Sequence, residues 1–162
     1  MEFRVGYGYD IHQFAEGKEM MLGGVKVTSP RGFLAHSDGD VLLHALCDAL
    51  LGAAGLGDIG EHFPDSDPRF RGAASAELTT HLVGIVTGQG WRVSNADLTV
   101  VIQEPKMHPY KERIRQRVAE LLGVDGSRVN VKAKTKEWLD AVGENRAAEA
   151  HAVVLIERNR TD

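Results

Sequence analysis

The sequence is almost free of cysteine and contains no long hydrophobic run. Its single cysteine, Cys47, excludes an internal disulfide and is typical of a reducing compartment. Because Cys47 lies deep in an apolar helical pattern, we interpret it as a core residue rather than a nucleophile. No apolar stretch approaches the roughly 18–20 residues that a membrane-spanning helix needs, so we expect no membrane partner. Residues 1–5 match neither a secretory leader nor a transit peptide, and we expect a cytoplasmic location.

The sequence also lacks a strong excess of charge of one sign. The formal net charge is −4, and no block of like charges occurs along the chain. Proteins that bind nucleic acid without sequence preference carry basic patches, so we expect no nucleic-acid partner. Internal repeats, linkers, a glycine-rich dinucleotide fingerprint and a phosphate-binding P-loop are missing as well.

The remaining composition is typical of one globular domain over residues 1–162. Hydrophobic residues make up 43% and charged residues 26% of the chain, close to the average of globular proteins. At this length roughly 68–70% of the unfolded surface can be buried, which is enough for a core without disulfides.

The hydrophobic pattern predicts a mixture of strands and helices. Apolar and polar residues alternate at 95–103, which predicts a strand, and a one-sided apolar stripe predicts a helix at 109–122. By the same criteria we expect strands at 4–9, 20–27, 129–134 and 150–157 and helices at 39–54 and 75–88. The first two strands are close enough to pair as a hairpin. We therefore predict an α+β fold, with a mixed four-stranded sheet, helices on one face and a small N-terminal hairpin.

Three residues are candidate metal ligands. Asp10 and His12 follow the first predicted strand, and alternate residues of an extended chain face the same side. His44 lies inside the leucine-rich helix. Carboxylates and imidazoles are normal zinc ligands, and three protein ligands leave the fourth position open, as in catalytic zinc sites. The alternative is a surface turn and a histidine that is hydrogen-bonded in the core.

The residues just before this helix have two interpretations. Ser37 and Asp40 fit a capping box, in which side chains bind backbone N–H groups of the first turn. Alternatively, His36 and Ser37 donate hydrogen bonds to a phosphate near the helix N-terminus. Asp40, His44 and Asp48 recur every four residues, so that a carboxylate either orients the histidine ring or is solvated.

Two further polar segments suit either a phosphorylated substrate or ordinary solvated loops. The long loop 58–75 is rich in turn-forming residues, which would also suit a substrate lid. Lys132, Lys134 and Lys136 end a predicted strand and could neutralise phosphates. Glu137 follows them and could hold a hard cation such as Mg²⁺.

Motifs over nearly the whole chain match one family in order and spacing. They are Gly6-x-Gly8-x-Asp10-x-His12, Leu34-Ala35-His36-Ser37-Asp38-Gly39-Asp40, His44-Ala45-Leu46, Asp48-Ala49-Leu50-Leu51-Gly52, Leu56-Gly57-Asp58-Ile59-Gly60, Phe63-Pro64-Asp65, Pro105-Lys106 and Val129-x-Val131-Lys132. The His-Ser-Asp-Gly-Asp string with its downstream histidine is the most specific. With these motifs the chain resembles the 2-C-methyl-D-erythritol 2,4-cyclodiphosphate synthase family of the non-mevalonate isoprenoid pathway.

The resemblance implies an activity and an assembly. Family members are phosphorus–oxygen lyases that convert 4-diphosphocytidyl-2-C-methyl-D-erythritol 2-phosphate into 2-C-methyl-D-erythritol 2,4-cyclodiphosphate and CMP. They are homotrimers with active sites between neighbouring subunits, and each site holds a zinc ion or another divalent transition metal. The resemblance thus implies a cytidine diphosphate substrate and a second copy of the chain as partners.

The resemblance also implies roles for individual residues. The zinc ligands correspond to Asp10, His12 and His44, and the ligand of a second divalent ion, Mg²⁺ or Mn²⁺, corresponds to Glu137. His36 and Thr135 correspond to catalytic residues. The substrate-binding positions correspond to Asp10, His12, His36, Ser37, Asp58, Ile59, Gly60, Phe63, Pro64, Asp65, Ser66, Asp67, Pro105, Lys106, Met107, Lys134, Thr135, Lys136 and Glu137. Among them, 58–60 and 63–67 contact methylerythritol and ribose, 102–108 form the cytidine pocket, and 134–137 hold the phosphates.

One segment departs from the family pattern. Many members have a Lys-Leu-Gly-Phe-Thr-Gly-Arg-like stretch after Glu137, whereas this chain has Trp138-Leu139-Asp140-Ala141-Val142-Gly143-Glu144. The phenylalanine and arginine that usually contact ligand are therefore missing at their simple positions. Two other functions stay open: a zinc-dependent hydrolase that releases linear phosphates, and a trimeric binding module in which zinc is structural or captures a ligand.

Overall fold

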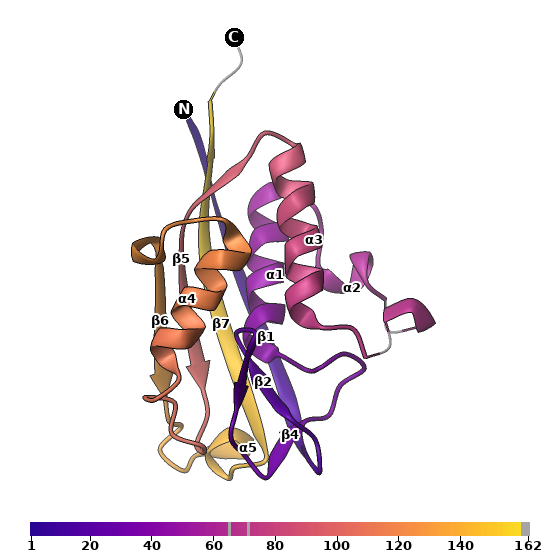
Figure 1. Cartoon of the computed structure of the whole chain (residues 1–162), viewed down its shortest axis with the longest axis vertical. Coiled ribbons are helices and arrows are strands. Elements are labelled where there is room, and N and C mark those ends of the chain that lie inside the picture. The colour runs from indigo at the N-terminus through magenta and orange to yellow at the C-terminus, as the bar shows by residue number, and fades with distance from the viewer. Residues whose placement is uncertain (65, 71, 160–162) are drawn as a thin grey trace.

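A mixed sheet forms the centre of the computed structural model, which describes residues 1–64, 66–70 and 72–159 (Figure 1). The strand order is β4 (Arg31–Phe33), β1 (Glu2–Glu16), β7 (Ala147–Arg158), β5 (Arg92–Val101) and β6 (Val129–Lys134). Neighbouring strands are antiparallel except β5 and β6, which are parallel. The α+β class is therefore confirmed, but the sheet has five strands rather than the predicted four.

The predicted pairing of the first two strands is wrong. β1 extends well beyond 4–9 and pairs along most of its length with β7, from the other end of the chain. β2 (Met20–Leu22) and β3 (Val25–Val27) pair with each other instead. Gly23 and Gly24 form the tight turn between them at positive φ, as two-residue hairpins require. The small hairpin thus exists, but it is built within 20–27.

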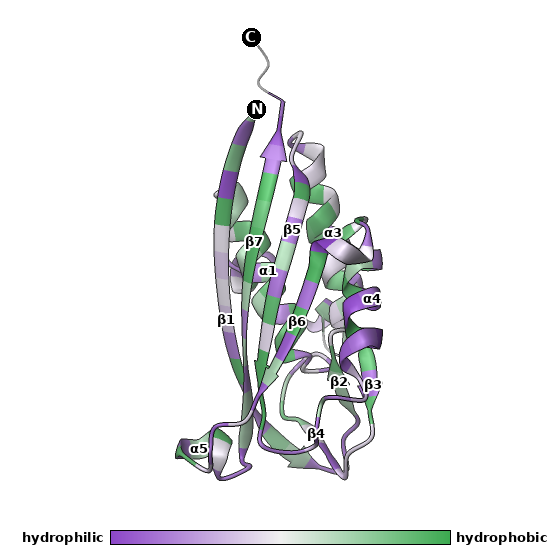
Figure 2. Ribbon diagram, turned by 90° about the vertical axis from the view of Figure 1, so that its left-hand side faces the viewer, coloured by the Kyte–Doolittle hydropathy of each residue, from purple (hydrophilic) through white to green (hydrophobic). Residues whose placement is uncertain are grey.

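The longer helices cover one face of the sheet, as predicted (Figures 1 and 2). They are α1 (Val41–Ala54), α3 (Ser75–Gly88) and α4 (Lys111–Leu122). α1 lies against β1 and β7, and α4 lies against β6. Short helices occupy the connections, namely α2 (Ile59–His62), η1 (Pro68–Phe70), η2 (Gly126–Arg128) and α5 (Asp140–Gly143). Within the described part of the chain, no helix is long and apolar enough to cross a membrane.

α1 begins at a buried carboxylate. Asp40 caps the helix by accepting the backbone N–H of Leu43 at 3.1 Å, and it also accepts those of Gly23 and Gly24 at 2.8 and 2.7 Å. Burial raises the pKa of Asp40 although these hydrogen bonds oppose the shift. The predicted capping box, with Ser37 as the cap, is therefore wrong, because Asp40 itself caps the helix. The same carboxylate ties the β2–β3 turn to the start of α1.

α1 packs directly on the backbone of β1 because two glycines provide the space. A Cβ atom on Gly6 would lie 1.8 Å from the carbonyl oxygen of Ala49, and one on Gly8 would lie 1.9 Å from that of Ala45. Any side chain at either position would overlap the helix backbone. This close approach sets the separation between β1 and α1.

Cys47 is a core residue of α1. Its side chain has no exposed surface, and burial raises the pKa of the thiol to about 12. A thiol in this state is a poor nucleophile, because the thiolate is the reactive form.

The face of the sheet opposite the helices, which we call the open face, carries exposed apolar side chains. They are Phe3, Val5, Tyr7, Tyr9 and Ile11 of β1 and Val153 of β7. Val5 is 67% exposed and Tyr7 60%. A contiguous apolar surface of this kind marks an interaction surface.

Gly8→Ala should destabilise the protein by about 2 kcal/mol or more, because the new methyl group forces α1 away from β1. Gly84→Ala in α3 is the matched control. Its methyl group would meet no atom within 4 Å, and the helix should gain up to about 1 kcal/mol. Urea unfolding followed by circular dichroism measures both changes. Equal stability of Gly8→Ala and the parent protein would contradict the close approach.

Candidate metal centre

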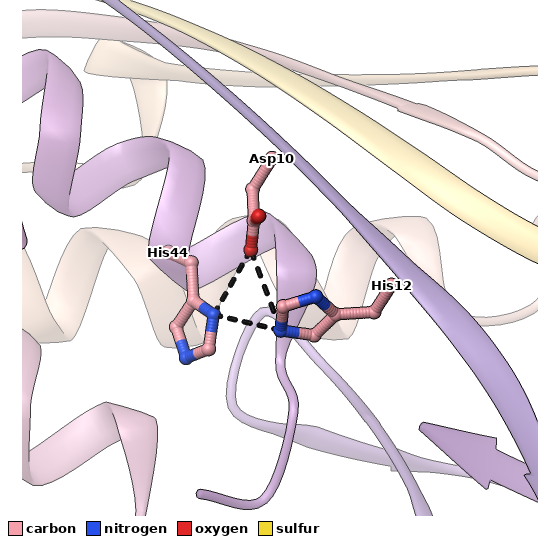
Figure 3. Close-up of side chains that lie close together, drawn as sticks. All are labelled: Asp10, His12 and His44. Carbon is pink, nitrogen blue, oxygen red and sulfur yellow. Dashed lines mark hydrogen bonds and ion pairs between the residues drawn. The ribbon is translucent and has the colours of Figure 1, made fainter. Parts of the chain in front are cut away.

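Asp10, His12 and His44 meet where β1 passes the first turn of α1 (Figure 3). Asp10 Oδ2 lies 3.0 Å from His44 Nδ1 and 3.5 Å from His12 Nε2. The two ring nitrogens are 3.1 Å apart. Each residue offers one ligand atom, and these atoms all lie within 4.8 Å of one another. The structure therefore brings the three predicted ligands together as a group that can hold a metal ion.

The backbone fixes the tautomer of His12. Its Nδ1 lies 2.7 Å from the carbonyl oxygen of Ile11, which can only accept a hydrogen bond. Nδ1 therefore carries the proton. In the neutral ring Nε2, which faces Asp10 and His44, keeps a lone pair, and a neutral imidazole is the form that binds metal.

A hydroxyl and a carboxylate fix the tautomer of His44. Its Nε2 lies 2.9 Å from Ser75 Oγ, and the Ser75 hydroxyl donates its own proton to Asp38 at 2.5 Å. Asp38 also accepts the backbone N–H of Ser75 at 3.1 Å. Because the Ser75 proton is committed to Asp38, His44 Nε2–H has to be the donor. The lone pair of the neutral ring is then on Nδ1, which faces Asp10 and His12.

The group that orients His44 is therefore Ser75, and not a carboxylate four residues away on α1. Asp40 binds backbone N–H groups, and Asp48 accepts the N–H of Ile59 at 2.8 Å. Ser75 is fully buried at the start of α3, 37 residues from Asp38. No sequence signal links two positions so far apart, so sequence reasoning missed this role.

The residues at this centre fit a divalent transition metal. Two imidazole lone pairs and one carboxylate oxygen face one another, and the hydrogens of the neutral rings point away, so a cation stabilises the arrangement. Without a cation, the protonated His44 ring can donate Nδ1–H to Asp10; burial lowers the pKa of His44, but this hydrogen bond and the Asp10 charge outweigh burial and raise it, so metal and proton compete for Nδ1. Two nitrogen donors and one oxygen donor suit Zn²⁺ and leave one tetrahedral position for a further ligand.

A cavity of about 680 Å³ opens beside the metal centre. It is lined by many of the predicted substrate-binding residues, namely Asp10, His12, His36, Ser37, Ile59, Gly60, Phe63, Pro64 and Asp67, together with His44. We call it the metal-side cavity. Asp58 instead caps α2 by accepting the N–H of Glu61 at 3.0 Å, and Ser66 is exposed. Asp65 lies outside the described residues.

Ser37 is placed to donate a hydrogen bond into the metal-side cavity. Its oxygen accepts the N–H of Gly39 at 3.1 Å and lies 3.2 Å from His44 Nε2, which is a donor. Both contacts use the oxygen as an acceptor, so the hydroxyl proton is left for another partner. A phosphate oxygen is such a partner.

A second cavity, of about 660 Å³, lies at the ends of β5 and β6. Its walls include the predicted residues Pro105, Lys106, Met107, Lys134 and Thr135 and also Arg31, Lys111 and Trp138, which the sequence did not assign. We call it the lysine-lined cavity. Residues 102–108, which the resemblance assigns to cytidine binding, line this cavity. Within one chain it is separate from the metal-side cavity.

Of the three lysines predicted to neutralise phosphates, Lys132 and Lys136 have acidic partners. Lys136 pairs with Glu149 and, at 3.6 Å, with Asp140, and these carboxylates raise its pKa. Lys132 pairs with Asp97 at 2.6 Å. Lys134 is the one of these three lysines that lines the lysine-lined cavity.

Glu137 is exposed and accepts a hydrogen bond from the Thr135 hydroxyl at 2.9 Å. It belongs to no group of three metal-ligating side chains among the described residues, whereas the triad of β1 and α1 does form such a group.

Comparison with known proteins identifies relatives that match nearly the whole chain. Residues 3–157 match the YgbB family. The 2-C-methyl-D-erythritol 2,4-cyclodiphosphate synthase of Pseudomonas putida (strain W619) is 58% identical over 153 residues, which are 94% of this chain and 98% of the relative. The synthase of the same name from Azotobacter vinelandii has the same identity and coverage.

Solved structures share the fold. A 2C-methyl-D-erythritol-2,4-cyclodiphosphate synthase with bound CDP has a TM-score of 0.88 at 40% identity, covering 95% of this chain and 100% of the other. The CDP complex of IspF from Plasmodium falciparum has a TM-score of 0.85 at 34% identity, covering 98% and 97%. The bifunctional IspDF of Campylobacter jejuni has a TM-score of 0.94 at 40% identity over 98% of this chain, which spans 43% of that longer protein. The family expected from the motifs is thereby confirmed: the chain belongs to the YgbB family and is an enzyme of the lyase class, like its synthase relatives.

Proposed function

We propose that this chain converts 4-diphosphocytidyl-2-C-methyl-D-erythritol 2-phosphate into 2-C-methyl-D-erythritol 2,4-cyclodiphosphate and CMP, in isoprenoid precursor biosynthesis. The observation that carries the proposal is the centre of Asp10, His12 and His44, whose ligand atoms converge beside a cavity that His36 and Ser37 also line. The names of the relatives, and the CDP bound in two similar structures, support the same substrate class. In this proposal residues 1–162 act as one domain in the cytoplasm.

The reaction is a phosphoryl transfer within one substrate molecule. An oxygen of the 2-phosphate forms a bond to the β-phosphorus. The bond from the β-phosphorus to the bridging oxygen breaks, and CMP leaves with that oxygen and its electron pair. Because the attacking phosphate is already anionic at neutral pH, no protein nucleophile is needed. The residues of the chain orient the substrate and neutralise its charge, and orientation alone can supply roughly 7–11 kcal/mol.

Each proposed residue has a defined task in this reaction. Asp10, His12 and His44 hold Zn²⁺ or another divalent transition metal, which when bound polarises a phosphate oxygen as a Lewis acid. Glu137 would supply one carboxylate to a second divalent ion, Mg²⁺ or Mn²⁺, which the substrate phosphates would also bind. His36 and Ser37 donate hydrogen bonds to phosphate oxygens on the metal side.

On the nucleotide side, Lys134 and Thr135 bind the diphosphate, while 102–108 bind the cytidine. Lys106 and Lys111 add positive charge to the same lysine-lined cavity. The acidic net charge of the chain is no obstacle, because the local lysines and the metal determine the field at the site.

The separation of the two cavities supports an active site shared between copies, as in the homotrimer that the family resemblance implies. The two proposed catalytic residues, His36 and Thr135, line different cavities of one chain. A complete active site then requires the lysine-lined cavity of a neighbouring copy against the metal-side cavity. The apolar open face provides the surface through which the copies associate.

The products distinguish this function from other uses of the same site. Phosphorus-31 NMR of the zinc- and magnesium-loaded protein with the cytidylylated 2-phosphate substrate should show CMP and the cyclic diphosphate in equal amounts. CMP with linear phosphates would indicate hydrolysis. No turnover by zinc-replete protein would indicate a binding module, and either of these results would reject the proposed function.

His44→Ala should leave a folded protein with little zinc and little activity. Removing the partners of a metal ligand already costs 10–100-fold in affinity, so removing the ligand itself should cost about 100-fold or more. His81→Ala, an exposed histidine of α3, is the control and should keep its zinc. Elemental analysis after dialysis measures the metal, and circular dichroism reports the fold. Full zinc occupancy in His44→Ala would show that the ligand assignment is wrong.

Val5→Asp should weaken the trimer, because it places a charge in the apolar open face. Val5 is 67% exposed in the single chain, so the substitution should cost little folding stability. Sedimentation velocity should give three times the 17.7-kDa chain mass for the parent protein and for the control Arg113→Asp on the helix side, and a smaller mass for Val5→Asp. Activity should fall together with the mass. An unchanged mass for Val5→Asp would show that the copies do not associate through the open face.

A further inference from the structure

We propose that Trp138 is the surface on which the cytosine ring of the nucleotide stacks, an inference that rests on the function proposed above. Trp138 stands in the segment that departs from the family pattern, and neither composition nor motif assigns it a role. Its position in the lysine-lined cavity supplies one.

The first observation is exposure at a cavity wall. Trp138 is 68% exposed and lines the cavity together with Pro105, Met107 and Lys134. Trp91, the other tryptophan, is 2% exposed and packs under the guanidinium groups of Arg4 and Arg158. An indole that stays exposed at a cavity wall offers aromatic surface to a flat ligand.

The second observation is that the backbone holds Trp138 in place by its own contacts. Glu137 and Trp138 have φ values of 52° and 64°, in the left-handed region that non-glycine residues rarely adopt. The buried side-chain oxygen of Gln103 accepts the backbone N–H of Lys136 at 3.3 Å and that of Trp138 at 3.5 Å. Gly143 packs against the Trp138 backbone so closely that a Cβ atom there would lie 2.4 Å from its carbonyl carbon. Strained conformations of this kind persist where surrounding contacts enforce them, and they cluster at ligand sites.

The third observation is the charge around the indole. Lys106, Lys111 and Lys134 line the same cavity, so an aromatic surface and several cations face one volume of about 660 Å³. An aromatic face with adjacent cations matches a nucleoside diphosphate, whose base stacks while its phosphates pair with the cations. Ligand cavities of this size hold molecules as large as a nucleotide. An apolar ligand would leave the lysines unpaired, and free phosphate would leave the indole uncovered.

Intrinsic fluorescence of the zinc-loaded protein tests the stacking directly. Titration with CDP should quench the emission of exposed Trp138, while pyrophosphate, which has no base, should leave it unchanged. Trp138→Phe is the matched control: it keeps an aromatic ring, so it should bind CDP with similar affinity, but the fluorescence change should vanish because Trp91 is buried. Trp138→Ala should raise the Kd for CDP, measured by calorimetry, roughly tenfold, since loss of one base–aromatic stack has effects of this order.

The outcomes separate this inference from the proposed function. CDP binding by calorimetry without quenching, and with an unchanged Kd in Trp138→Ala, would reject the stacking role and leave the function standing. Absence of CDP binding to the parent protein would reject both. Emission that acrylamide cannot quench in ligand-free protein would show that another copy covers Trp138, and this result would also overturn the proposal.

Discussion

The contact between the backbones of β1 and α1 is the constraint on which the rest of the structure depends. Gly6 and Gly8 bring the helix against the strand, since nothing larger than hydrogen fits beneath the carbonyl oxygens of α1. Asp10 and His12 continue the same side of β1 and reach His44 in the first turn of the helix. Alternate residues on one side of β1 therefore have two roles. The glycines set the position of α1, and Asp10 and His12 provide two of the three metal ligands.

Hydrogen bonds outside the centre give its ligands their chemical form. The Ile11 carbonyl and the Ser75 hydroxyl hold the two imidazole rings with their lone pairs inward. Asp38 and Asp40 lie close to the proposed phosphate site, but both carboxylates turn inward to backbone N–H groups. Backbone N–H groups at the starts of α1 and α3 thus already offset part of their negative charge, which reduces their repulsion of a bound phosphate. Asp38 and Asp40 thus hold Ser75 and the start of α1 in place beside the metal centre.

The chain divides its binding chemistry between two cavities. The metal-side cavity has imidazole, carboxylate and hydroxyl groups, whereas the lysine-lined cavity has cations and an indole. Lys132 and Lys136 line neither cavity, and each pairs with an acidic neighbour. The first cavity thus suits a metal ion and a phosphate, and the second suits a nucleotide. The phosphate and the nucleotide are both parts of the proposed substrate.

The sequence by itself determined the α+β class, most helices and strands, the three metal-ligand candidates and the family. Each of these properties depends on a local pattern or on a sequence motif. A periodic pattern indicates which side of one helix or strand is buried, and a motif has ligand residues of fixed type at fixed spacing. Only the tertiary structure decided the fifth strand, the pairing of β1 with β7, the role of Ser75 and the position of Trp138. Each of these depends on groups far apart in the chain, such as Asp38 and Ser75 or Gln103 and Trp138. Patterns within one segment carry no information about such partners, because the free energy of the contact exists only after the chain has folded.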